Sequence, residues 1–177
     1  MFLDLLRKRR SIRQYQDRPV EGEKIEQLTE AMLRSPSSRG LNPWEFVVVT
    51  EKETIERLSR AKQHGSAFAK GAPLAIVVLG DPARGDVWIE DCSIAALVIH
   101  LACADLGLGS CWIQIRKRDH DGKITAEEYV RGVLGVRPEL QVEAIIAIGY
   151  PKEEKAGHPQ ATLPWDKVSQ NRYGNKT

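Results

Sequence analysis

The chain has 177 residues, of which 26 are basic and 24 acidic, so its formal net charge is only +2. This length suits one domain, residues 1–177, with a core that needs neither disulfides nor a structural metal. The balanced charge argues against nucleic acid or a membrane surface as a partner, and three cysteines without a CxxC pair predict reduced thiols in a cytoplasmic protein.

The first residues do not predict a secretory signal, because their charges follow a very short apolar stretch. The longest apolar segment, residues 94–108, is interrupted by His100 and Asp105 and is too short to span a bilayer.

Apolar residues at three- and four-residue spacing predict helices, and short runs rich in β-branched residues predict strands. In chain order, the expected elements are a helix at 2–10, a helix at 23–33, a strand at 44–49, a helix at 51–62, a strand at 75–79, a helix at 87–106, a strand at 110–115, a helix at 125–134 and a strand at 142–148. The order is no regular βαβ repeat and no GxGxxG follows a strand, so we expect an α+β protein rather than a Rossmann fold.

Two segments suggest contacts with a second chain. The helix at 87–106 is apolar almost all round, which predicts burial on more than one side, and we expect a subunit interface to cover one of them. The polar tail from Lys152 contains Trp165 and Tyr173, and aromatic residues in such a tail suggest docking rather than disorder.

A basic cluster follows the first helix: Arg9, Arg10 and Arg13 fall within five residues together with Ser11. Guanidinium groups bind phosphate oxygens through paired N–H donors, and a serine hydroxyl adds a short donor. In an extended stretch Arg9, Ser11 and Arg13 would share one face. Taken alone, the cluster could equally be a solvated basic turn.

A second candidate is the small, polar loop at residues 35–38. Its serine side chains and free backbone N–H groups would let a flat ring approach closely, and Asn42 carries both a donor and an acceptor for the imide edge of a heterocycle. An ordinary loop between helices is the alternative interpretation.

Acidic residues at 119–128 approach the spacing of a calcium loop, but its first position is Lys117, a cation that repels calcium. We therefore expect a polar turn followed by a capping box, with Thr125 as N-cap and Glu128 at N3.

The histidines form no metal or nucleophile motif, and we expect His100, within an apolar helix, to be a buried imidazole with a hydrogen-bond partner. No P-loop, GxSxG or kinase motif is present either. If the protein is an enzyme, a bound cofactor would perform its chemistry.

Four motifs, in this order and spacing, resemble the nitroreductase family of FMN proteins. They are the basic cluster, the loop at 35–38 followed by Asn-Pro-Trp at 42–44, the segment at 106–113 and the Ala-Ile-Gly-Tyr-Pro run at 147–151. The resemblance covers most of the chain. It implies an α+β fold with a central, mainly antiparallel sheet of about four to five strands surrounded by helices, in a domain-swapped homodimer whose tail, residues 152–177, docks on the partner subunit.

The resemblance implies that Arg9 and Ser11 bind the FMN phosphate and that Arg10 is a further phosphate or ribityl contact. Arg13 would lie at the pyrimidine edge of the flavin, where a cation stabilises the reduced ring. The longer enzymes of the family carry a lysine near the flavin, but the corresponding residues 66–68 contain no cation, so this charge would come from Arg13.

The remaining implied contacts come from four regions. The partner subunit would supply Pro36, Ser37 and Ser38 over the isoalloxazine, and Asn42 would contact the ring or the ribityl chain. The segment formed by Trp112, Ile113 and Gln114 would donate a backbone N–H to flavin N5. Gly149 would allow a close approach near the phosphate, and Arg172 would close the phosphate site.

The implied activity is ping-pong transfer of hydride from NAD(P)H through flavin N5 to a small electron-poor acceptor such as a nitroaromatic, quinone or enone. Neither a side-chain acid or base nor a metal is required. Three alternatives stay open: a redox sensor or flavin carrier that binds FMN without turnover, an interaction protein that has lost the cofactor, and a flavin-degrading enzyme.

Overall fold

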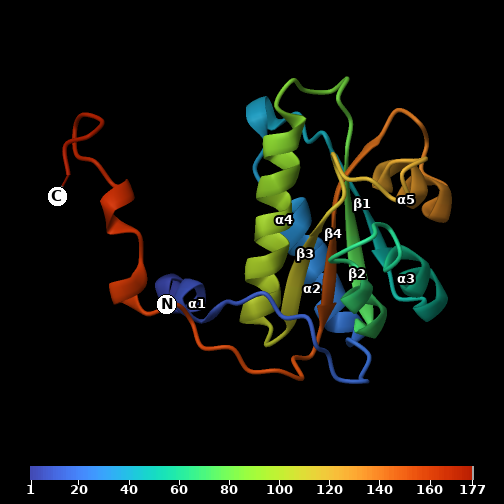
Figure 1. Ribbon diagram of the computed structural model, residues 1–177, viewed down its shortest axis with the longest axis horizontal. Coiled ribbons are helices and arrows are strands. Elements are labelled where there is room, and N and C mark those ends of the chain that lie inside the picture. Colours follow the sequence, from blue (N-terminus) through green and yellow to red (C-terminus); the bar gives the residue numbers. More distant parts are fainter. Residues whose placement is uncertain (177) are drawn as a thin grey trace.

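Four antiparallel strands form the centre of the computed structural model, which describes residues 1–176 (Figure 1). In spatial order they are β1 (Trp44–Val49), β2 (Leu74–Gly80), β4 (Gln141–Gly149) and β3 (Gly109–Gln114). All three neighbouring pairs are antiparallel. The predicted α+β class and mainly antiparallel sheet are confirmed, and β1 has the predicted bounds.

The helices cover both faces of this sheet (Figure 1). They are α1 (Phe2–Lys8), α2 (Gly22–Leu33), α3 (Lys52–Leu58), α4 (Trp88–Asp105) and α5 (Ala126–Leu134). One core lies between the sheet and α3 with α5, and a second lies between the sheet and α4 with α2. No helix among residues 1–176 is long and apolar enough to cross a membrane.

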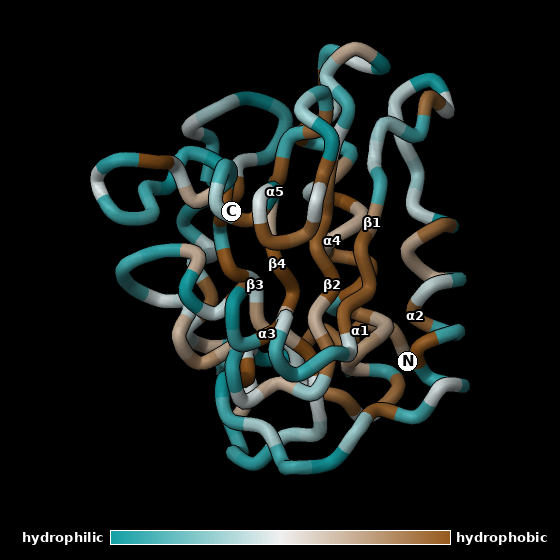
Figure 2. Tube along the Cα trace, turned by 90° about the vertical axis from the view of Figure 1, so that its right-hand side faces the viewer, coloured by the Kyte–Doolittle hydropathy of each residue, from teal (hydrophilic) through white to brown (hydrophobic). Residues whose placement is uncertain are grey.

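The alternation of side chains along the strands feeds these two cores. Val77 and Ile145 lie in the first core, whereas Ile76 and Ile146 lie in the second. Figure 2 shows the same division, with hydrophobic residues along the strands and hydrophilic residues in the surrounding loops. Both faces of the sheet are therefore buried.

Two predicted helices are too long at their C-terminal ends. α1 stops at Lys8 rather than Arg10, because the chain turns extended at Arg9 and pairs with β3 at Ser11. α3 stops at Leu58 rather than residue 62, since the buried Ser66 hydroxyl donates to the carbonyl oxygens of Ser59 at 2.8 Å and Lys62 at 3.2 Å. The first correction comes from a tertiary contact and the second from a local side-chain hydrogen bond, and both override helical propensity.

The turn before α5 has the predicted polar character. Asp119 accepts from the Gly122 N–H at 2.7 Å, and Asp121 accepts from the Lys123 N–H at 2.9 Å. Thr125 then caps the helix: its hydroxyl accepts from the Glu128 N–H at 3.1 Å, and the Glu128 carboxylate accepts from the Thr125 N–H at 2.7 Å. The capping-box prediction is confirmed.

The tail behaves differently in its two halves. Residues 152–156 run alongside the segment after α1, whereas the later part, with the short turns η3 (Gln160–Thr162) and η4 (Trp165–Lys167), extends away from the body (Figure 1). Trp165 is 57% and Tyr173 101% exposed. Their docking on a partner stays a prediction.

Candidate functional site

Residues 9–16, which follow α1 and which we call the basic segment, lie along the open edge of β3. Ser11 forms a parallel bridge with Ser110, and the Ile12 N–H donates to the Ser110 carbonyl at 3.0 Å. Gly109 makes this approach possible, because a Cβ there would lie 2.8 Å from the Cβ of Ile12. The sequence therefore places three arginines along one edge of the sheet.

Tyr15 holds the far end of the same segment. Its buried hydroxyl is 2.7 Å from the carbonyl oxygen of Ile12 and 3.1 Å from that of Ala147 in β4. The sequence interpretation missed this residue, although an aromatic side chain in a polar stretch indicates an anchor.

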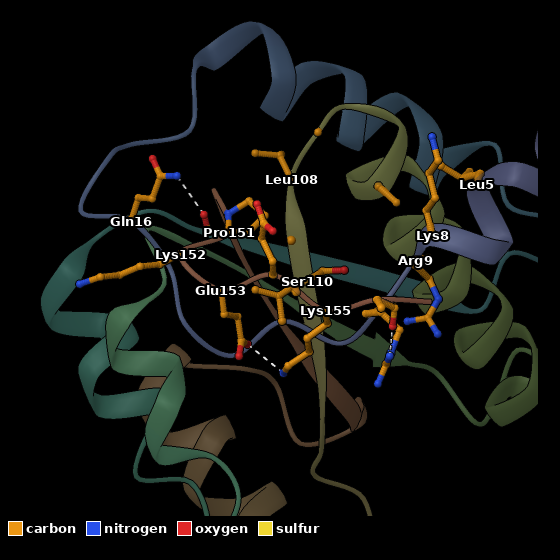
Figure 3. Close-up of a pocket in the computed structure, with 17 residues that line it drawn as sticks. Leu5, Lys8, Arg9, Gln16, Leu108, Ser110, Pro151, Lys152, Glu153 and Lys155 are labelled. Atoms are coloured by element: carbon orange, nitrogen blue, oxygen red, sulfur yellow. Dashed lines mark hydrogen bonds and ion pairs between the residues drawn. The ribbon is translucent and has the colours of Figure 1, made fainter. Parts of the chain in front are cut away.

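A cavity of about 900 Å³ opens between this segment, the start of β3 and residues 151–156 (Figure 3). Its cationic lining residues outnumber its acidic ones; they are Lys8, Arg9, Arg10, Lys152 and Lys155 against Glu153 and Glu154. Within residues 1–176, Arg9 forms no ion pair with a carboxylate. Such a lining favours an anion, and phosphate suits a guanidinium group.

His100 belongs to α4 and is a buried neighbour of Arg9. The imidazole is 7% exposed and its Nδ1 is 2.6 Å from the Ser110 hydroxyl, so the predicted buried, hydrogen-bonded histidine is confirmed. Burial, and secondly the charge of Arg9, lower the pKa of His100 to about 4. Arg9 is thus close enough to a buried group to disfavour a second positive charge.

The open edge of β3 also offers backbone donors. Because Ser110 hydrogen-bonds outward to Ile12, the alternation of an antiparallel ladder turns the backbone groups of Trp112 and Gln114 to the same edge. From Ser110 to Gln114 the strand rises roughly 13 Å. Backbone donors thus run along this edge from Ser110, which lines the cavity, toward Gln114.

The side chains at this end of β3 are fixed by hydrogen bonds. The Trp112 indole donates to the Gln114 side-chain oxygen at 2.9 Å, and the Gln114 amide donates to the Arg116 carbonyl at 3.1 Å. Ile113, between them, is 1% exposed and belongs to the core. Of the three predicted positions, Trp112 and Gln114 turn their backbone groups to the open edge, whereas the backbone of Ile113 turns toward β4.

Arg13 lies on the exposed side of the segment, where its guanidinium is 5.8 Å from the centroid of the Phe68 ring. Phe68 comes from the turn η2 (Ala67–Gly71) and is half-buried. A cation over an aromatic face keeps its charge while its position is restrained. Arg13 is thus restrained beside η2.

The loop at residues 36–42 lies elsewhere in the same chain. It precedes β1, which forms the opposite edge of the sheet from β3, roughly 14 Å away across three strand spacings. The Ser38 N–H donates to Asp91 at the start of α4, at 2.9 Å. Pro36, Ser37, Ser38 and Asn42 are therefore not gathered around the basic cavity of their own chain.

Hydrogen bonds within this loop fix the conformation of Asn42. Asn42 has a left-handed backbone with φ of 47°, and its N–H donates to the Ser37 hydroxyl at 2.9 Å. That hydroxyl in turn donates to the Asn42 side-chain oxygen at 2.8 Å. Asparagine tolerates this left-handed backbone, and its hydrogen bonds with Ser37 fix the loop before β1.

Gly149 and Arg172 have surroundings that the sequence did not indicate. A Cβ at Gly149 would lie 2.5 Å from Pro73 and 3.0 Å from Tyr15, so its close approach is to its own chain. Gly149 also pairs with Gly109 at the cavity end of the sheet. Arg172 lies in the outer part of the tail, which leads away from the body (Figure 1).

The nitroreductase family profile matches residues 6–65 and 59–150. The chain belongs to the nitroreductase family. An FMN-dependent nitroreductase from Clostridium difficile R20291 superposes with a TM-score of 0.95 at 48% identity, over 97% of this chain and 99% of that chain. The family that the four motifs predict is thus confirmed.

Two curated relatives agree. A protein of Archaeoglobus fulgidus, provisionally named NADH dehydrogenase/NAD(P)H nitroreductase, is 36% identical over 86% of this chain and 87% of its own. The NADH dehydrogenase of Thermus thermophilus is 30% identical over 91% of each chain.

Proposed function

We propose that this nitroreductase-family chain is an FMN-dependent oxidoreductase that uses NAD(P)H and works in the cytoplasm. When bound, FMN would take hydride from NAD(P)H at N5 and pass it to a small electron-poor acceptor, a nitroaromatic, quinone or enone, in a ping-pong cycle. The observation that carries the proposal is the half-buried Arg9, which forms no ion pair within residues 1–176 and lies in a basic cavity lined by the first residues of β3.

The residues of the cavity, of the basic segment and of the adjoining edge of β3 suit this cofactor. Arg9 and Ser11 would hold the phosphate, with Arg10 as a further contact, because guanidinium and hydroxyl donors match its oxygens. The outward N–H groups of Trp112 and Gln114 are donors for the polar edge of the ring. The exposed guanidinium of Arg13, restrained by Phe68, would stabilise negative charge on the reduced ring.

We also propose that the working unit is a homodimer with the cofactor at the interface. In one protomer the loop at 36–42 and the outer tail lie apart from the basic cavity, and α4 exposes Ile94 by 40% and Leu97 by 51%. A second copy would cover this helix face. It would bring Pro36, Ser37, Ser38 and Asn42 over the ring, and the tail with Arg172 would dock across the interface.

The test is an anaerobic absorbance titration of the FMN-supplemented protein with NADH and, separately, NADPH. Rapid bleaching of the flavin band supports a reductase and identifies the donor. A band that persists with both donors would favour the sensor or carrier alternative, and protein that binds no FMN would refute the proposal. Light scattering on the same sample tests the dimer.

A further inference from the structure

Residues 150–156, which we call the strap, run antiparallel to the basic segment along its exposed side. The Gln16 N–H donates to the Tyr150 carbonyl and the Lys152 N–H to the Gln14 carbonyl, both at 2.9 Å. At the far end, the Arg10 guanidinium donates to the carbonyl of Ala156. The basic segment is therefore held between β3 on one side and the strap on the other.

Glu153 occupies the middle of the strap, and one of its oxygens collects three donors. Oε1 accepts from the Arg13 N–H at 2.6 Å and from the Gln14 N–H at 3.3 Å. It also accepts from the Lys155 ammonium at 2.9 Å (Figure 3). Its side chain is 17% exposed. These bonds lower the pKa of Glu153, led by the bond from the Arg13 backbone, so the carboxylate is ionised at neutral pH.

Lys155 links Glu153 to Ser11, the residue of the basic segment proposed to bind phosphate through its hydroxyl. Its ammonium, which pairs with Glu153, also donates to the carbonyl oxygen of Ser11 at 3.0 Å. The backbone from Ser11 to Gln14 is thus fixed from two sides. Ser110 of β3 binds the Ile12 N–H. The Glu153–Lys155 pair binds the Ser11 carbonyl and the N–H groups of Arg13 and Gln14. This pattern sets the direction in which the side chains of Ser11 and Arg13 point.

Glu153 lines the cavity, and its negative charge would repel an anionic ligand. A carboxylate at this position therefore requires a structural explanation. Hydrogen bonds to charged groups are stronger than neutral ones, so an ionised Glu153 orders the segment more firmly than a neutral side chain. The repulsion is offset locally, since Lys155 neutralises the carboxylate.

We infer that Glu153 is a positioning residue for FMN: it holds the backbone from Ser11 to Gln14 in the conformation that receives the phosphate. The inference rests on the proposed function. It is independent of the partner subunit, because every contact in it is made within one chain.

The test compares FMN and riboflavin binding by titration of flavin fluorescence on apo protein. The variants are Glu153→Gln and, as a control with the same change of charge, Glu139→Gln, an exposed residue outside the cavity lining. We expect E153Q to weaken FMN binding by about tenfold or more, as loss of a charged hydrogen bond predicts. The preference for FMN over riboflavin should fall, while E139Q binds both as the wild type does.

Three outcomes would overturn the inference: unchanged FMN affinity in E153Q, tighter FMN binding through removal of the negative charge, or an equal loss for FMN and riboflavin. If E153Q does not fold, Glu153→Asp keeps the charge but shortens the reach and replaces it in the same comparison. Failure of the wild type to bind FMN would instead refute the proposed function, so the two results are distinguishable.

Discussion

The buried imidazole of His100 should make the stability of the fold depend on pH in a defined window. In the unfolded chain the group titrates near 6.5, whereas burial and the charge of Arg9 lower its pKa to about 4 in the folded protein. Between these values the unfolded chain binds more protons than the folded one. The free energy of unfolding therefore falls as the pH falls from about 6.5 to about 4.

The size of this effect follows from the two pKa values. Each pH unit between them contributes about 1.4 kcal/mol, so the full loss is about 3 kcal/mol, and about 2 kcal/mol of it is reached by pH 5. The side chain is only 7% exposed, so solvent screening reduces the figure little. A loss of this size is large against a typical total stability of about 5–15 kcal/mol.

Urea unfolding of the wild type and His100→Gln at several pH values, with protein and FMN concentrations fixed, measures it. The glutamine amide can still hydrogen-bond to Ser110 but does not titrate. Carboxylates that protonate at low pH contribute equally to both proteins, so the difference between the two curves isolates His100. Parallel curves from pH 7.5 to about 5 would refute the assigned burial and pKa.

Three further changes test other parts of the structure. Gly109→Ala should destabilise the fold by about 1–3 kcal/mol and weaken FMN binding, because its Cβ collides with Ile12. The control is Gly132→Ala, where an added Cβ would meet no other part of the chain within 4 Å. It should leave FMN binding unchanged and either leave the free energy of unfolding unchanged or raise it by up to about 1 kcal/mol. Arg13→Ala should lower both FMN affinity and the rate of flavin reduction in stopped flow, and a variant that keeps both would contradict its role. Thr125→Ala should cost about 1 kcal/mol in thermal unfolding through loss of the capping box, with FMN affinity unchanged.

The parts of the fold that the sequence predicts well are those with local causes. β1 has its predicted bounds because the aromatic and β-branched run at 44–49 favours a strand even at the edge of the sheet, where only Trp44 and Val49 are buried. Thr125 with Glu128 forms a cap within four residues. The end of α1 has a distant cause. Arg9 and Arg10 continue a helical pattern, but pairing with Ser110 draws them into an extended segment.

The same distinction explains which site residues were missed. Glu153 lies 140 positions from Arg13, and nothing in its own neighbourhood separates it from Glu154. The motif at 147–151 does locate the cavity end of the sheet, but the close neighbours of Gly149 are Pro73 and Tyr15. Local patterns therefore identify the family and the basic segment, whereas the contacts that orient the segment require the fold.

The structure also separates two interpretations of the basic cluster that its sequence left open. In a solvated turn, water would surround Arg9 and no buried group would respond to its charge. Arg9 is instead half-buried, unpaired within residues 1–176 and close enough to His100 to lower its pKa. An anion bound at Arg9 would offset this repulsion, so FMN should raise the pKa of His100 while riboflavin, which lacks the phosphate, should change it less. Histidine NMR titrations of the apo, riboflavin-bound and FMN-bound protein measure the difference, and equal pKa values in all three would place the phosphate away from Arg9.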